Sequence, residues 1–356
     1  MQIADLYKIY QQHPSIQTDT RKLQSGDLFF ALKGPNFNGN LFAKQALEAG
    51  AAYAIIDEPQ QGETDERLII TPDVLTTLQA LALYHRQQLN IPFIAITGSN
   101  GKTTTKELVY EVLKSQFITY TTKGNLNNHI GVPLTILSVK PDAQMAVIEM
   151  GANHQQEIAG YCQYTLPTYG IITNCGKAHL EGFGGEAGVR KGKGELYDFL
   201  RQHQGTAFVM NDYDYLREMS TGIESVITYG TTHADVVGVA LPQEMLAVSL
   251  MMDGHPQLIQ TNLVGNYNLP NVLVAVTVGL HFGIAFDKIK QAIEGYIPSN
   301  SRSQLIQKDT NKIVLDAYNA NPTSMRAAIE NLATHYPGKR VLMLGGMMEL
   351  GDESLA

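Results

Sequence analysis

The residues best placed to do chemistry form a glycine-rich loop at 97–104, Thr-Gly-Ser-Asn-Gly-Lys-Thr-Thr. An apolar run over 93–96 precedes this loop, and apolar residues at helical spacing follow it, so we expect a strand, a loop and a helix. In that context the glycines let backbone N–H groups turn toward an anion, while lysine reaches terminal phosphates and a threonine hydroxyl can bind Mg²⁺. The pattern predicts a nucleoside triphosphate site at Gly98, Ser99, Asn100, Gly101, Lys102, Thr103 and Thr104.

The loop departs from the full phosphate-loop pattern at one position. Ile96 stands where that pattern has its first glycine, so the loop has the compact form Gly-x-x-Gly-Lys-Thr. The alternative interpretation is a tight turn that carries a surface lysine.

Other polar residues follow predicted strands. Glu149 lies at the end of the strand-like run 145–150, where a carboxylate beside a phosphate loop can bind Mg²⁺, or can simply cap the next turn. His179 comes just after the run 169–174. Lys191 and Lys193 precede an apolar helical pattern, where they either steer phosphates or are solvated residues at the start of a helix.

The elements that must position these residues alternate between strand and helix from 93 to about 300. Strand-like runs occur at 93–97, 145–150, 169–174, 207–211 and 226–229. Their spacing allows right-handed crossovers, which predicts a mostly parallel α/β sheet covered by helices, with ligands at the carboxyl ends of the strands. Residues 234–264 alternate apolar with polar and predict a small antiparallel addition. Helices are expected at 268–283 and 287–296.

Two further regions flank this pattern. Residues 1–88 read as a small α/β domain, with strands at 27–32 and 52–56 and helices at 42–49 and 74–88. A third unit begins near 312, with a strand at 313–316, a helix at 324–336 and a strand at 340–344. We therefore expect three domains, at 1–90, 91–308 and 309–356. Because one such βαβ unit cannot close a core, we expect the last domain to be incomplete.

Three polar loops accompany these domains. Residues 18–21, Thr-Asp-Thr-Arg, precede the first predicted strand and by themselves favour a solvated loop. Residues 265–271 place Asn268 as a helix N-cap and offer the amides of Asn266, Asn268 and Asn271 to a base edge. Residues 300–302 read as an interdomain loop carrying Arg302, and Asp316 ends a predicted strand.

Bulk composition excludes several classes of protein. The formal net charge is −8 and no basic patch is visible, so we expect no nucleic-acid binding. The longest apolar run, 272–286, is broken by His281 and is shorter than the ~20 residues that span a bilayer, so we expect no membrane insertion. Two cysteines are too few for a disulfide framework and fit a reducing cytosol. Residues 1–5, Met-Gln-Ile-Ala-Asp, lack a basic start followed by an apolar run, so we expect no signal peptide. We expect a cytoplasmic, monomeric enzyme.

Taken together, these residues resemble the Mur ligase family, the ATP-dependent amide-forming enzymes that build the peptide of bacterial cell-wall precursors. The resemblance covers essentially the whole chain. Family-wide signals are the phosphate loop, Glu149, His179, the Lys193 segment, Asn268, Asn271 and Arg302. More specific motifs are residues 124–134 (Gly-Asn-Leu-Asn-Asn-His-Ile-Gly-Val-Pro-Leu), 178–184, 318–322 and 349–351, together with Asp-Thr-Arg at 19–21.

The resemblance implies an architecture and a reaction. The architecture has a small N-terminal α/β domain, a central P-loop ATPase-like domain and a C-terminal Rossmann-like domain. The reaction joins D-alanyl-D-alanine to UDP-N-acetylmuramoyl tripeptide through an acyl phosphate, in peptidoglycan precursor synthesis. ATP and two Mg²⁺ ions are the implied cofactors.

Roles carried over by position follow from the same resemblance. Lys102, His179 and Lys193 are implied as catalytic. Thr103, Glu149, His179 and Lys193 are implied as metal ligands, Lys193 as a carbamate made from CO₂. Lys193 is preferred over Lys191 because the Gly-Glu-Leu-Tyr that follows it matches the family. Asn268, Asn271, Arg302 and Asp316 are implied to contact the nucleotide, and Thr18, Asp19, Thr20, Arg21, Asn125, Asn127 and Asn128 to contact the UDP substrate.

The chain also departs from the family pattern. Ala317 stands where the family usually has Asp or Ser, and Gly346 stands where it usually has Asp. Family members also usually continue for about half a domain beyond Ala356. The alternatives are a sister Mur ligase that adds the third peptide residue, a folylpolyglutamate-synthase-like ligase and a P-loop regulatory switch. The asparagine-rich motif at 124–134 argues against the two ligases.

Overall fold

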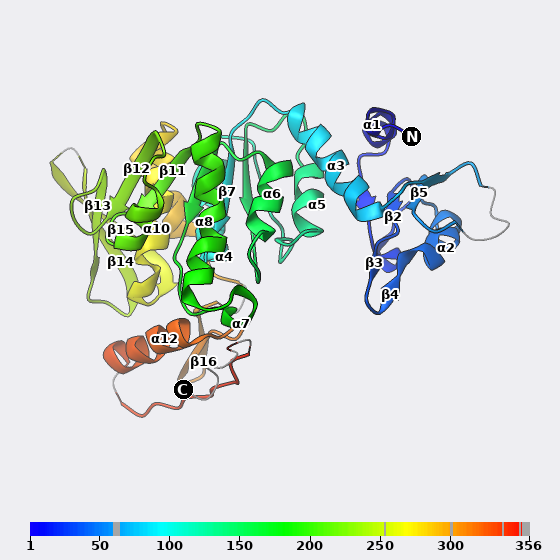
Figure 1. Ribbon diagram of the computed structural model, residues 1–356. Helices are drawn as coiled ribbons and strands as arrows, with labels where there is room; N and C mark the ends of the chain where they lie inside the picture. Colours follow the sequence, from blue (N-terminus) through cyan, green and yellow to red (C-terminus); the bar gives the residue numbers. More distant parts are fainter. Residues whose placement is uncertain (60–64, 253, 300–301, 337, 349, 351–356) are drawn as a thin grey trace. The chain divides into compact units, whose positions relative to one another are not determined.

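The computed structural model describes residues 1–59, 65–252, 254–299, 302–336, 338–348 and 350 (Figure 1). Two units make up the chain. The first comprises residues 1–91, 122–143 and 163–166, and the second comprises 92–121, 144–162 and 167–356. The asparagine-rich segment therefore belongs to the same unit as the N-terminal residues, although the phosphate loop and its helix come between them in sequence.

A four-stranded parallel sheet lies at the centre of the first unit, in the order β1–β2–β5–β6. Its strands are β1 (Ile16–Gln17), β2 (Leu28–Phe30), β5 (Tyr53–Ile56) and β6 (Leu68–Ile70); a short hairpin adds β3 (Lys33–Gly34) and β4 (Phe37–Asn38). The helices are α1 (Ile3–Gln12), α2 (Ala43–Glu48), α3 (Val74–Gln87) and α5 (Gly131–Leu137), with 3₁₀ turns η1 (Thr20–Lys22) and η2 (Gly39–Phe42). The strands and helices expected in residues 1–88 are confirmed.

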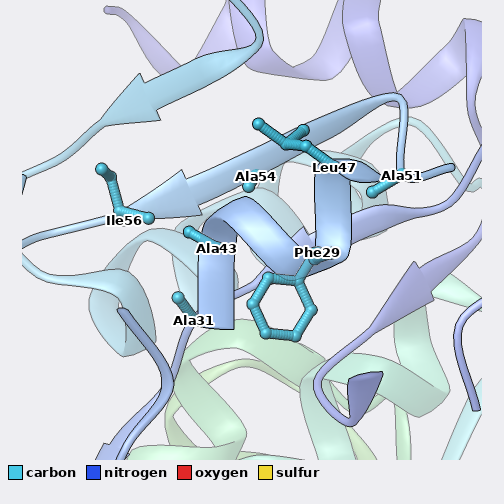
Figure 2. Packing of buried hydrophobic residues seen from close by; sticks show 8 residues of the cluster. Phe29, Ala31, Ala43, Leu47, Ala51, Ala54 and Ile56 are labelled. Carbon is cyan, nitrogen blue, oxygen red and sulfur yellow. The ribbon is translucent and has the colours of Figure 1, made fainter. Parts of the chain in front are cut away.

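A compact apolar cluster joins α2 to this sheet (Figure 2). Phe29 is the one aromatic ring among its fully buried members, and small alanines let the helix approach the strands closely. The members are Phe29, Ala31, Ala43, Ala46, Leu47, Ala51, Ala54 and Ile56. The small domain thus has a core of its own.

The second unit is built on a nine-stranded sheet in the order β15–β14–β13–β12–β11–β10–β7–β9–β8. The strands from β8 to β13 are parallel, and β13, β14 and β15 pair antiparallel. The bounds are β7 (Phe93–Thr97), β8 (Thr119–Thr121), β9 (Met145–Glu149), β10 (Tyr169–Ile172), β11 (Thr206–Met210), β12 (Ser225–Gly230), β13 (Val236–Leu241), β14 (Met245–Met252) and β15 (His255–Val264). This confirms the mostly parallel sheet and its antiparallel addition.

Helices cover both faces of this sheet, as right-handed crossovers require. One set packs together and includes α4 (Lys102–Lys114), α10 (Leu269–His281) and α11 (Phe286–Gly295); the other elements are α6 (Glu157–Thr165), α7 (Leu180–Phe183), α8 (Glu186–Gln202), α9 (Asp214–Met219) and η3 (Asn266–Asn268). Every residue of β7 and β9 is buried, which is typical of a central parallel strand. No helix among the described residues is long and apolar enough to cross a membrane.

The last part of the chain contains β16 (Gln304–Lys308), β17 (Asn311–Leu315) and α12 (Pro322–His335), drawn in orange tones in Figure 1. Antiparallel pairing of β16 with β17 was not expected from the sequence. The strand expected at 340–344 is wrong: these residues form no strand, and Val341 and Met343 are 79% and 92% exposed. A run this apolar forms a parallel strand only when both of its faces are covered, and no residue of α12 is buried.

Candidate active site

Strand, loop and helix at the phosphate loop form as the sequence predicts. β7 ends at Thr97 and α4 begins at Lys102. Gly98 and Gly101 have φ of +141° and +80°, which only glycine adopts without strain. A Cβ at Gly98 would lie 2.0 Å from Thr173 Oγ1. Both glycines are therefore required by the backbone and by the space around it.

Lys102 lies folded over its own loop. Its Nζ donates to the carbonyls of Gly98 at 2.7 Å and Ser99 at 3.1 Å. The pKa of Lys102 is lowered to about 8, chiefly by burial; the Glu149 carboxylate opposes this shift and the cation of Arg302 contributes to it. The amine is held at the centre of the loop, where a bound phosphate would offer it stronger acceptors than two carbonyls.

Thr103 and Glu149 meet beside the loop. The Thr103 hydroxyl donates to Glu149 Oε1 at 3.2 Å, and both residues are buried. Ile96 pairs with Glu149 and Thr97 pairs with Ile172, so three strands end at this edge. A hydroxyl and a carboxylate are oxygen donors that suit Mg²⁺. The described residues contain no group of three His, Cys, Asp or Glu placed to hold a metal ion, so water or phosphate oxygens would complete the coordination of a Mg²⁺ ion here.

The loop after β10 holds the phosphate loop in place. Asn174 binds Asn100 twice, through Asn100 N to Oδ1 at 3.0 Å and from Nδ2 to Asn100 O at 3.0 Å. Thr173 Oγ1 donates to the same carbonyl at 2.6 Å, and Ser99 Oγ donates to Gly176 O at 3.0 Å. Sequence reasoning missed Thr173 and Asn174. Their position at the end of a strand neighbouring β7 is the signal that indicates them.

His179 adopts a left-handed conformation, with φ 53° and ψ 36°, immediately before α7. Such a conformation is uncommon outside glycine and is found often at functional sites. A Cβ at Gly182, in α7, would lie 2.3 Å from Asn153 O, so α7 packs against the loop that follows Glu149. The structure thus brings the elements carrying His179 and Glu149 together.

Lys193 is buried, whereas Lys191 is exposed. Lys193 Nζ donates to Ala152 O at 3.0 Å and lies 4.8 Å from the centre of the Phe183 ring. Burial lowers the pKa of Lys193 to about 7, and the Lys102 cation adds to that shift. The Lys193 amine, on α8, is therefore largely neutral slightly above neutral pH and lies beside the loop that follows Glu149.

Glu195 follows Lys193 by two residues in α8 and contacts the same loop. Its two oxygens accept from Gln156 N at 2.6 Å and Ala159 N at 2.9 Å, at the start of α6. A carboxylate at a helix N-terminus satisfies orphan N–H groups and interacts well with the helix dipole. Sequence reasoning used Glu195 only as part of a motif and missed this role.

The asparagines before and in α10 make internal contacts. Asn268 Nδ2 donates to Val264 O at 2.9 Å, and Asn271 Nδ2 donates to Asn268 Oδ1 at 2.9 Å. Thr105 Oγ1 donates to Asn271 Oδ1 at 3.0 Å, so this chain of amides ties α10 to α4. Asn268 stands at the N-cap position, but the expected side-chain cap is wrong, since its amide binds the preceding strand instead.

Arg302 and Asp316 lie close to one another in the last part of the chain. The Arg302 guanidinium carbon lies 3.8 Å from the centre of the Tyr318 ring. Asp316 Oδ1 accepts from Ser303 N at 3.2 Å, and burial raises the pKa of Asp316. Of the predicted interdomain loop 300–302, residues 300 and 301 lie outside the described residues, as do 349 and 351 of the motif 349–351.

In the first unit, the polar cluster 18–21 is organised by an ion pair. Arg21 binds Asp19 through two parallel hydrogen bonds, Nε to Oδ1 and Nη2 to Oδ2, each 2.8 Å long. Hydrogen bonding to Arg21 lowers the pKa of Asp19 to about 2. The 3₁₀ turn η1 starts at Thr20, directly after Thr18 and Asp19. The cluster is thus a partly exposed turn with an ion pair of its own.

The asparagine-rich segment leads into α5 of the same unit. Asn128 Oδ1 accepts from Ile130 N at 3.1 Å and Gly131 N at 2.9 Å. Asn127 N donates to Asn125 O at 2.8 Å, and both Asn125 and Asn128 are exposed. The structure therefore places both predicted substrate-binding segments in one unit.

Comparisons with known proteins agree with this organisation. Three family descriptions match the chain: "Mur ligase family, catalytic domain" at residues 14–96, "Mur ligase middle domain" at 96–279 and "Mur ligase, glutamate ligase domain" at 301–356. The middle-domain match begins at Ile96 and includes the phosphate loop, Glu149, His179 and Lys193.

Individual relatives are similar over most of the chain. The UDP-N-acetylmuramoyl-tripeptide–D-alanyl-D-alanine ligase of Bacillus subtilis is 37% identical over 343 residues, which is 95% of this chain and 74% of that protein. A crystal structure of MurF from Acinetobacter baumannii has a TM-score of 0.87 at 33% identity, covering 98% of this chain and 80% of that one. MurF from Thermotoga maritima, in complex with ADP, has a TM-score of 0.86 at 26% identity, covering 96% and 80%. The chain belongs to the Mur ligase family.

Proposed function

We propose that this chain is an ATP-dependent ligase that joins D-alanyl-D-alanine to UDP-N-acetylmuramoyl tripeptide in peptidoglycan precursor synthesis. The observation that carries the proposal is the 37% identity, over 95% of the chain, to a ligase of that name. The site geometry supports it, because a phosphate loop with Thr103 hydrogen-bonded to Glu149 suits a triphosphate and Mg²⁺.

The reaction requires activation of a carboxylate, which is a poor acyl donor. The terminal carboxylate oxygen of the tripeptide attacks the γ-phosphorus of ATP, and ADP leaves. The dipeptide amine then attacks the acyl carbon, inorganic phosphate leaves, and the amine loses a proton. Most of the protein's contribution is positioning and charge neutralisation, because two anions must approach each other.

In this proposal Lys102 and the N–H groups of residues 98–104 bind the phosphates. Thr103, Glu149, His179 and a carbamylated Lys193 would hold two Mg²⁺ ions, whose charge would offset that of the triphosphate and carboxylate. Two observations support this assignment: the pKa of Lys193 is lowered to about 7, and its side chain is buried beside the loop after Glu149. Arg302 and Asp316 contact the nucleotide, as do Asn268 and Asn271 if their internal contacts open.

The UDP end of the substrate is assigned to the first unit, through Thr18, Asp19, Thr20 and Arg21 and through Asn125, Asn127 and Asn128. We also propose the domain division 1–90, 91–308 and 309–356. A cytoplasmic location, where ATP is available, and a monomeric state complete the proposal.

The test is ATP hydrolysis measured with each substrate omitted in turn. Phosphate release that needs both UDP-N-acetylmuramoyl tripeptide and D-alanyl-D-alanine supports the proposal. The sister ligases are tested in the same assay by supplying UDP-N-acetylmuramoyl dipeptide with diaminopimelate or lysine, or a folate with glutamate. Turnover with one of those pairs and not with D-alanyl-D-alanine would overturn the assignment.

A further inference from the structure

A buried histidine of the first unit makes polar contacts that the proposed reaction does not use. His85, near the end of α3, is 3% exposed. Its Nε2 lies 2.7 Å from the carbonyl oxygen of Val139, and its Nδ1 lies 3.0 Å from the hydroxyl of Tyr7 on α1. The imidazole therefore connects two helices of the N-terminal part of the chain to the segment 122–143.

The contacts determine which nitrogen carries the proton. A carbonyl oxygen can only accept, so Nε2 must carry hydrogen, and in a neutral ring Nδ1 then accepts from Tyr7. Burial lowers the pKa of His85, which favours the neutral ring. The groups around the ring are Tyr7 and Tyr10 of α1 and the carbonyl of Val139, with Tyr84 against Tyr7. Two consecutive hydrogen bonds thus run from the Tyr7 hydroxyl to His85 Nδ1 and from His85 Nε2 to Val139 O.

Val139 lies just beyond the C-terminal end of α5. At the same end, the Tyr10 hydroxyl donates to the carbonyl of Leu137, the last residue of that helix. Carbonyls in the last turn of a helix have no partner within the helix, so Tyr10 satisfies one that would otherwise be orphaned. Near the other end, Gln79 Nε2 of α3 donates to His129 O at 3.1 Å. Side chains of α1 and α3 therefore hold α5 at both ends.

The start of α5 is closely packed against the asparagine-rich loop. A Cβ at Gly131 would lie 2.3 Å from the backbone of Leu126, so no larger residue fits between the loop and the helix. Asn128 Oδ1 accepts from the first N–H groups of the helix. Any rotation or shift of α5 would consequently displace Asn125, Asn127 and Asn128.

From this arrangement we infer that His85 is a positioning residue for the UDP-muramoyl substrate: it fixes α5, and α5 sets the place of the asparagine loop. The inference rests on the proposed function, which assigns that substrate to the asparagines. His85 itself contacts no reacting group, so its loss should affect binding of the UDP substrate and leave ATP binding unchanged.

Two substitutions separate the hydrogen bond from the volume of the ring. In His85→Gln the amide nitrogen can take the place of Nε2 and still donate to Val139 O. In His85→Asn the shorter side chain can accept from Tyr7 but cannot reach the carbonyl. His281→Asn is the matched control, because His281 Nε2 lies 3.3 Å from the Tyr169 hydroxyl in the second unit.

Amide hydrogen exchange and calorimetry on the full chain test the inference. We expect residues 122–143 to exchange faster in His85→Asn, and Kd for UDP-N-acetylmuramoyl tripeptide to rise about fivefold, the effect of one buried hydrogen bond. Kd for ATP should not change, and His85→Gln and His281→Asn should resemble wild type.

Different results overturn different statements. Wild-type protein that binds no UDP-N-acetylmuramoyl tripeptide overturns the proposed function and this inference with it. Wild-type-like Kd for that substrate in His85→Asn, or an equal loss of ATP affinity, overturns the inference alone. An equal loss in His85→Gln overturns the role of the hydrogen bond and leaves only a requirement for the ring.

Discussion

Asn321 and Asn100 face each other through their side-chain amides, and this contact joins the start of α12 to the phosphate loop. Asn321 Nδ2 donates to Asn100 Oδ1 at 2.6 Å, and Asn100 Nδ2 donates back to Asn321 Oδ1 at 3.5 Å. Asn321 Oδ1 also accepts from Ser324 N at 2.9 Å, within a capping box. Lys177 N donates to Thr323 Oγ1 at 3.2 Å. The start of α12 therefore contacts both loops of the proposed ATP site.

Replacing Asn321 by Asp should weaken ATP binding without uncapping α12. Aspartate keeps the oxygen that accepts from Ser324 N, but it cannot donate to Asn100 and it brings a negative charge toward the triphosphate. We expect KM for ATP to rise about tenfold, the order of one charge-assisted interaction. Asn321→Ser, a neutral cap, should raise it less. Equal KM values in wild type and Asn321→Asp would contradict a role for this contact.

Lys102→Ala should slow ligation by two to three orders of magnitude while the protein stays folded. Within the described residues its amine donates only to carbonyls of its own loop, so little tertiary structure depends on it. Loss of a cation aimed at the transferred phosphate costs roughly 10²–10³ in rate for preorganised groups of this kind. Steady-state kcat/KM and the unfolding temperature are the two measurements. A variant with wild-type kcat/KM would refute the phosphate-binding role.

The same lysine predicts a dependence of ATP binding on pH. Because the pKa of Lys102 is lowered to about 8, the ammonium that binds phosphate is present below that pH and is lost as pH rises through it. KM for ATP should therefore increase above about pH 8 in wild type. Bound phosphate stabilises the Lys102 cation, so Lys102 loses its proton at a higher pH in the ATP complex than in the free protein. In Lys102→Ala this dependence should disappear; its persistence there would assign it to another group.

The central sheet and phosphate loop could be predicted because short buried strands and glycine turns are local signals in the sequence. The placement of Glu149 at a strand end followed from the same pattern and is confirmed by its pairing with Ile96. The packing of 122–143 with α1 and α3 could not be predicted, since contacts such as His85 with Val139 join residues far apart in sequence. The direction of the Asn268 amide also depends on tertiary contacts, here with Val264.

Gly98→Ala should destabilise the protein, and Gly160→Ala should not. At Gly98 a methyl group would lie 2.0 Å from Thr173 Oγ1, on a backbone with φ +141°, so we expect a loss of about 1–3 kcal/mol. Gly160 is exposed within α6 and has open space around it, so alanine should stabilise by about 0.5–1 kcal/mol. Thermal unfolding distinguishes them. Equal unfolding temperatures for the two variants would show that the loop tolerates a side chain.

Lys193 is predicted to react with CO₂, and Lys191 serves as its control. A lone pair on the neutral amine attacks the carbon of CO₂, and loss of one proton leaves a carbamate with two oxygens. Because burial lowers the pKa of Lys193 to about 7, the reactive neutral form grows as pH rises through 7. An ammonium at this position would repel a Mg²⁺ ion held by Glu149, whereas a carbamate would bind it.

Three measurements on Lys193 follow from this chemistry. Lys193→Ala should lose most activity and regain part of it with added formate or acetate, because a small carboxylate can occupy the space left by the carbamate. Lys191→Ala should change activity little, since Lys191 is exposed. Wild type supplied with ¹³CO₂ should give a carbamate carbon signal by NMR that strengthens above pH 7 and is absent in Lys193→Ala. Full activity in Lys193→Ala, or a carbamate signal that survives that substitution, would show that the lysine has no such part in the reaction.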